Sequence, residues 1–218
     1  MIRNLTPIVK NLLIINGLVF LALSLKVIPD SITAQYFLLW KTDVLGLRTF
    51  LISLGMPLIP PGNFFEPLQV LTHFFTHIQL YHILFNMLAL ASLGPLVETV
   101  LRPERFLKFY LFCGILGGIL VALLDPSPNP VLGASGAISG VVLAFARFFP
   151  RQKLSIFFIG SFEAEKLVKG FIIISIGLFL LEFMRPGAGA GISHFGHLMG
   201  FLAGWLYFKV EHYIPPFR

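Results

Sequence analysis

The sequence predicts an all-α integral membrane protein with six transmembrane helices, and composition is the first observation behind this. Of the 218 residues 56% are hydrophobic and only 12% are charged, and the mean hydropathy is +0.87. A soluble globular domain carries about twice that share of charge. Several apolar runs also approach the ~20 residues that a helix needs to cross a bilayer. A very large buried core would be a poor explanation for a chain of this length.

The apolar runs and the breakers between them place the elements. Prolines end the helices around Asp125–Pro130, and glycines make a loop of Arg185–Gly191. The connection from Lys26 to about Leu68 is long and partly apolar, which predicts a membrane-associated first loop with short interfacial helices. We expect a single domain over residues 1–218, with spans near 8–25, 81–97, 106–124, 135–149, 167–183 and 192–210.

The basic residues predict the orientation in the membrane. With the N-terminus inside, twelve of the sixteen lysines and arginines lie in inner segments and four in outer ones. This asymmetry favours both termini on the cytoplasmic side, so the second, fourth and sixth spans begin at the outer face. The net charge of +6 therefore reflects topology and not a nucleic-acid partner. We interpret the first apolar run as a span, because it lacks a small-residue cleavage site.

The segment Gly133–Gly140 contains a serine between glycines at the start of the fourth span. Ser135 would lie among the unpaired N–H groups and the positive dipole of a helix N-terminus, where an oxyanion finds donors. The alternative is that Ser135 is a helix cap and that Gly136 and Gly140 are close-packing residues. The stretch by itself does not decide between a nucleophile and a packing device.

The sixth span carries a histidine on a face of small residues. His197 precedes Gly200 by three residues and Gly204 by seven, so the three share one helix face. If this face packs on Gly136 and Gly140, His197 lies against Ser135 as a base. Measured from His194, the same spacing does not fall on glycines, so His194 is expected nearer the outer surface.

Further polar residues stand at the outer end of the second span. His82 and Asn86 are one helical turn apart, and both can donate hydrogen bonds to an oxyanion. A metal site is the rival interpretation, since His73 and His77 are also four residues apart. No carboxylate or cysteine joins these histidines locally, so we expect neither a metal nor another cofactor. The single cysteine, Cys113, excludes an internal disulfide.

These motifs together resemble the rhomboid intramembrane serine proteases. The resemblance rests on Gly133-Ala134-Ser135-Gly136, on His77-x4-His82-x3-Asn86 and on His197-x2-Gly200-x3-Gly204, and it covers about two-thirds of the chain. It implies a six-helix bundle with a Ser–His dyad and no aspartate. Ser135 would be the nucleophile and His197 the general base and acid. The Ser135 backbone N–H, His82 and Asn86 would form the oxyanion hole.

The resemblance also implies partners and a location. Family members cut the transmembrane helices of other proteins near a membrane face, so we expect transmembrane protein substrates in a lipid bilayer. A compact chain without a targeting extension suits a bacterial plasma membrane. The rival is a catalytically silent rhomboid-like protein that binds membrane helices, although both dyad residues are present. A transporter would be expected to show inverted repeats or charges within its spans.

The chain departs from the family at several positions. Many members carry an aromatic residue four positions after the nucleophile, packed on the catalytic histidine, where this chain has Ser139. Another common pair, Trp-Arg in the first loop, is matched by Leu68-Gln69. Glu98 matches a family glutamate and is expected to be structural, pairing with Arg102 one turn further on.

Overall fold

Helices make up most of the structure, a computed structural model that describes residues 5–40, 53, 65–125, 127, 129–156, 160–185 and 192–210. Within these residues, four helices are long and apolar enough to cross a membrane. They are α1 (Pro7–Ser24), α5 (Leu80–Leu101), α6 (Pro103–Leu124) and α8 (Ala164–Met184). The predicted all-helical membrane class is confirmed at this level.

Two shorter helices complete the bundle. Helix α7 (Ser135–Phe148) has 14 residues and α9 (His194–Val210) has 17. A straight helix needs about 20 residues to cross the hydrocarbon core, so the count of six spans stays a prediction.

Smaller elements connect these helices. Helix α2 (Asp30–Tyr36) lies in the long first connection, and α4 (Gln69–Thr72) and the 3-10 turn η1 (His73–Phe75) precede α5. Strands β1 (Lys153–Ile156) and β2 (Gly160–Glu163) form an antiparallel hairpin between α7 and α8, which the sequence did not predict. Residues 41–52 and 54–64 of the first loop, and 186–191 of the loop before α9, lie outside the described residues.

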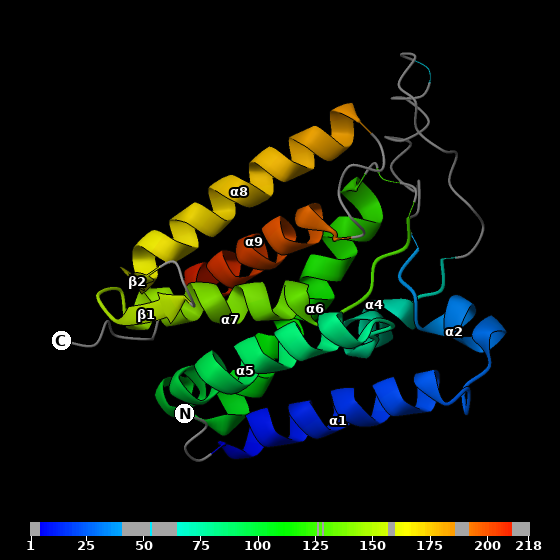
Figure 1. Cartoon of the computed structure of the whole chain (residues 1–218), viewed down its shortest axis with the longest axis horizontal. Coiled ribbons are helices and arrows are strands. Elements are labelled where there is room, and N and C mark those ends of the chain that lie inside the picture. Colours follow the sequence, from blue (N-terminus) through cyan, green and yellow to red (C-terminus); the bar gives the residue numbers. More distant parts are fainter. Residues whose placement is uncertain are drawn as a thin grey trace.

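Helices α7 and α9 lie in the middle of the bundle. Figure 1 shows α8 along one side of this pair and α5 followed by α1 on the other. Helix α9 packs on α6, α7 and α8, whereas α1 packs mainly on α5. This order places the starts of α7 and α9, which carry the predicted nucleophile and base, inside the bundle.

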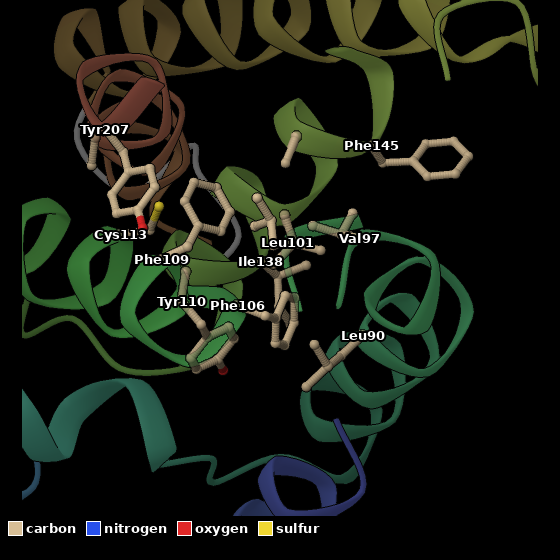
Figure 2. Close-up of a cluster of buried hydrophobic side chains, with 14 of the residues drawn as sticks. Leu90, Val97, Leu101, Phe106, Phe109, Tyr110, Cys113, Ile138, Phe145 and Tyr207 are labelled. Carbon is tan, nitrogen blue, oxygen red and sulfur yellow. The ribbon is translucent and has the colours of Figure 1, made fainter. Parts of the chain in front are cut away.

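Aromatic side chains from α6 form much of the core between α5, α7 and α9. Figure 2 shows Phe106, Phe109 and Tyr110 in this cluster, and all three are fully buried. The Phe109 ring meets Tyr207 of α9 with centroids 5.0 Å apart. Lipid tails are as apolar as these side chains, so close van der Waals packing holds such a core together within a membrane.

Glycines bring α7 and α9 into backbone contact. A methyl group on Gly200 would lie 2.0 Å from the Gly136 carbonyl oxygen, and one on Gly204 would lie 3.1 Å from the Gly140 Cα. Glycines at the same spacing meet in register, so the two helices run parallel and begin at the same end of the bundle. This is the approach that the sequence predicts for the fourth and sixth expected spans.

Glu98 is structural, as expected, but its partner is different. Its buried carboxylate accepts hydrogen bonds from the backbone N–H groups of Ile8, at 3.1 Å, and Val9, at 2.9 Å, and from the Thr6 hydroxyl. The pairing with Arg102 is therefore wrong. The first N–H groups of α1 have no acceptor within their own helix, so a carboxylate supplied by α5 satisfies them and complements the helix dipole.

Candidate active site

The segment that leads into α7 is fixed by the η1 region. The Gly133 N–H donates to the His73 carbonyl at 2.9 Å, and the Ala134 N–H donates to His77 Nε2 at 3.3 Å. Gly133 has a φ of +104°, a conformation that glycine adopts without strain. Ser135 is the first residue of α7, and no side chain of the described residues caps this helix. Its N–H group is therefore available to a bound group.

The sequence left the roles of His73 and His77 open. Both residues accept hydrogen bonds from the segment before Ser135, His73 through its carbonyl and His77 through its ring. His73 Nδ1 donates to the Gln69 carbonyl at 2.8 Å, while His77 Nε2 accepts the Ala134 hydrogen bond. Burial lowers the pKa of each ring to about 4, and the nearby His82 adds to the effect on His77. Both rings are therefore neutral at pH 7, which His77 requires in order to accept a hydrogen.

A cavity of about 390 Å³ opens at the start of α7. Ser135, His197, His82 and Asn86, the four residues that the sequence singled out, all line it. They come from three helices, α7, α9 and α5. The structure thus brings together every residue of the predicted site, although these residues are separated by up to about half of the chain.

His197 is nearly buried at the side of this cavity, with 9% of its surface exposed. Its Nδ1 has no hydrogen-bond partner, and among the described residues no hydrogen bond joins its ring to the Ser135 hydroxyl. The ring packs against two others, Phe171 of α8 at 5.4 Å and His194 at 5.9 Å between centroids. Two aromatic rings therefore pack against this imidazole.

His194 is the first residue of α9, one helical turn before His197. It is buried, with 7% of its surface exposed, and does not face water. His194 is also not among the cavity's lining residues, whereas His197 is, and this agrees with the choice made from the glycine spacing.

His82 and Asn86 line the cavity from α5. A methyl group on Gly133 would lie 2.5 Å from the His82 ring, so the absence of a side chain there lets this ring pack on the segment before Ser135. Asn86 donates one amide hydrogen to the His82 carbonyl at 2.9 Å. An asparagine amide carries two hydrogens, so a second donor remains for a group in the cavity.

The structure shows the contacts of Ser139 and Gln69, two positions at which the chain departs from the family pattern. Ser139 lines the cavity, but its hydroxyl donates to the Ser135 carbonyl at 2.8 Å, within its own helix. Gln69 is fully buried and donates to the Gln35 carbonyl at 2.7 Å, while its oxygen accepts the Trp40 N–H at 3.1 Å. This glutamine therefore fastens α4 to the segment around α2.

Sequence reasoning missed Phe171. It lies in the middle of α8, in a continuous apolar run, and it lines the same cavity. Nothing in that run marks one phenylalanine as different from another. Which face of α8 meets α9 is set by packing, so no local signal identifies this residue.

The fold and the cavity together define a class: a polytopic helical membrane protein with a serine and a histidine facing one cavity inside its bundle. Residues 65–213, more than half of the chain, match the family described as "Rhomboid domain". The chain belongs to the rhomboid family, as the sequence motifs indicated, and it is an integral membrane protein.

The similar proteins carry rhomboid names, and some of these names include the word protease. "Rhomboid protease GluP" of Bacillus subtilis (strain 168) is 34% identical over 139 residues, 63% of this chain and 24% of the relative. "Presenilin-associated rhomboid-like protein, mitochondrial" of Homo sapiens is 29% identical over 143 residues, 63% of this chain and 36% of the relative. This chain thus spans about a quarter to a third of the length of these two.

A second Bacillus subtilis (strain 168) protein, named "Putative rhomboid protease YdcA", is similar over nearly its whole length. It is 28% identical over 204 residues, which are 93% of this chain and 87% of the relative. The similarity therefore extends beyond the family domain toward the N-terminal helix.

Proposed function

We propose that this protein is an intramembrane serine endopeptidase that cleaves transmembrane segments of other proteins with a Ser135–His197 dyad. The cavity supports the proposal most directly, because it collects Ser135, His197, His82 and Asn86 from three helices. A packing role for Ser135 would not require a cavity at its side chain or a histidine across it.

The first chemical step is acylation. The Ser135 oxygen attacks the carbonyl carbon of the scissile peptide bond, and His197 takes the hydroxyl proton. The carbonyl oxygen becomes an oxyanion. The Ser135 N–H, the His82 ring and the Asn86 amide are the donors for this charge, which concentrates where the uncapped N-terminus of α7 is positive.

The second step releases the products. His197 gives its proton to the leaving amine, the C–N bond breaks, and an ester remains on Ser135. A water molecule then loses a proton to His197 and attacks the ester carbon, and His197 returns that proton to the Ser135 oxygen as the acid fragment leaves. The His197 ring exchanges protons with the Ser135 hydroxyl, the leaving amine and the water molecule. All three react at the same carbonyl carbon, so the ring has to rotate little between the steps.

Orientation and location belong to the same proposal. We place both termini in the cytoplasm and the cavity near the outer face of a bacterial plasma membrane, with six spans. The distribution of lysine and arginine supports this, twelve in the inner segments against four in the outer ones. Substrates are transmembrane proteins, and no cofactor takes part in the steps above.

The test compares matched variants in proteoliposomes with a cleavable transmembrane substrate. Ser135→Ala and His197→Ala should abolish cleavage, and Ser135→Ala should abolish labelling by a fluorophosphonate probe. Ser139→Ala is the control, because it removes a hydroxyl of the same cavity that bonds only within α7. Unchanged cleavage in the two dyad variants would refute the assignment. Binding of the substrate without cleavage by the parent protein would favour the silent helix-binding alternative.

A further inference from the structure

The orientation of His197 needs a structural cause. In a serine–histidine–aspartate site the carboxylate holds the imidazole in its productive orientation. Here Nδ1 of His197 is buried without a hydrogen-bond partner among the described residues. The neighbour on α7 that carries an aromatic ring in many relatives is Ser139, and its hydroxyl is engaged with the Ser135 carbonyl. Another group must therefore fix the ring.

Phe171 of α8 has the geometry for this role. Its ring centroid lies 5.4 Å from that of His197 with an interplanar angle of 58°. Phe171 also meets Phe201, one turn further along α9, edge to face at 5.4 Å and 84°. Phe201 is buried, so it holds Phe171 in place, and Phe171 in turn closes one side of the imidazole. Aromatic pairs at these separations are favourable beyond their burial.

We propose that Phe171 is the positioning residue for His197, so that α8 supplies the aromatic support that α7 lacks at Ser139. Phe171 also lines the cavity, next to the proposed base. The proposal rests on the proposed function for its kinetic consequence, but the ring contact itself can be measured without catalysis.

Helix α8, which carries Phe171, is less buried than the helices that carry Ser135 and His197. Helix α8 has only three buried residues, Ala164, Val168 and Ser175, and it packs mainly on α9 and α7. The orientation of the base therefore depends on a helix that has few buried contacts, whereas Ser135 and His197 themselves lie on helices joined by backbone contact. Displacement of α8 would release His197 without moving Ser135.

The kinetic test uses Phe171→Leu, which keeps an apolar side chain of similar size and removes the ring. We expect kcat to fall by about tenfold or more, a fraction of what a positioned general base contributes, with KM changed by less than about twofold. Phe171→Tyr keeps the ring and should retain most of the activity. Phe179→Leu is the matched control, since this ring lies on the same helix and contacts Phe183 and Phe195 instead.

A spectroscopic arm reads the contact directly. In protein labelled with isotopes at histidine, Phe171→Leu should shift the ring signals of His197, assigned by their loss in His197→Ala, because a neighbouring aromatic ring current disappears. Phe179→Leu should leave them in place. Parental kcat in Phe171→Leu, or an equal loss in Phe179→Leu, would overturn the proposal, as would an unshifted His197 signal. A parent protein that neither cleaves nor labels at Ser135 would instead refute the proposed function, and the signal would still decide the contact.

Discussion

Helices α7 and α9 are packed in a different way from α8, although all three border the same cavity. Glycines bring α7 and α9 so close that a methyl group on Gly200 would meet the Gly136 carbonyl at 2.0 Å. On α8, Gly170 and Gly177 have no atom within 4 Å of the position that a methyl group would take. Large apolar side chains of α8, such as Ile173 with 68% of its surface exposed, point away from the protein.

The two kinds of helix packing differ in how firmly they fix the residues of the proposed site. In a membrane, helices gain little from hiding apolar surface from lipid, so close backbone contact is what makes a helix pair rigid. The predicted nucleophile and base lie on the rigid pair, where their separation is fixed. The ring that supports the base lies on the loosely held helix.

The largest effect is expected for Gly200→Ala. The added methyl group overlaps the backbone of α7, which cannot rotate away, so the two helices must separate. We expect a loss of stability of about 3 kcal/mol, at the upper end for overpacking, and loss of measurable cleavage. Gly204→Ala, whose methyl group meets the Gly140 Cα at 3.1 Å, should cost less. Thermal unfolding in detergent and cleavage assays measure both, and equal stability of the two variants would contradict the packing argument.

A smaller but still large effect is expected for Gly133→Ala, at the entrance to α7. The residue has a φ of +104°, and its methyl group would lie 2.5 Å from the His82 ring. The strain costs about 1–2 kcal/mol. Displacement of His82 removes a proposed oxyanion donor, so kcat per folded molecule should fall in addition to the loss of stability. If stability fell while kcat per folded molecule stayed at the parental value, His82 would have no part in the reaction.

Acid should weaken the attachment of the segment before Ser135. The pKa of His77 is lowered from 6.5 to about 4 in the folded protein, so folding opposes its protonation. Its contribution to stability is complete above pH 6.5 and declines as pH falls from 6.5 toward 4. Melting temperature should therefore drop over this interval. His77→Gln, whose side-chain oxygen still accepts the Ala134 hydrogen bond but does not titrate, should show a shallower drop; an identical pH dependence would contradict this.

The smallest effect is expected for Gly177→Ala on α8. The new methyl group meets no atom within 4 Å, and alanine favours helix over glycine by about 0.5–1 kcal/mol. Stability should rise slightly, and cleavage should stay within about twofold of the parent. A loss comparable to that of Gly200→Ala would show that α8 is held as closely as α9 and would remove the contrast.

The sequence predicted the positions of the helices better than the tertiary contacts of individual residues. Apolar runs between charged or proline-rich segments indicated α1, α5, α6, α7, α8 and α9, because hydropathy and breakers act locally. The β1–β2 hairpin escaped notice because its strands have only four residues each. The partners of Glu98 and the burial of His194 escaped as well, since both depend on elements distant in sequence.

The sequence by itself determined the membrane class and the family, and it favoured His197 over His194 as the candidate base. The spacing of Gly200 and Gly204 favours His197, because residues three and four positions apart lie about one turn apart on the same face of any helix. Only the tertiary structure decided which groups surround the base. Ser139 leaves the imidazole without an aromatic neighbour on α7, and the packing of α8 on α9 supplies Phe171. Helix faces meet through the packing of the whole bundle, so a contact between two apolar runs has no signature in either run.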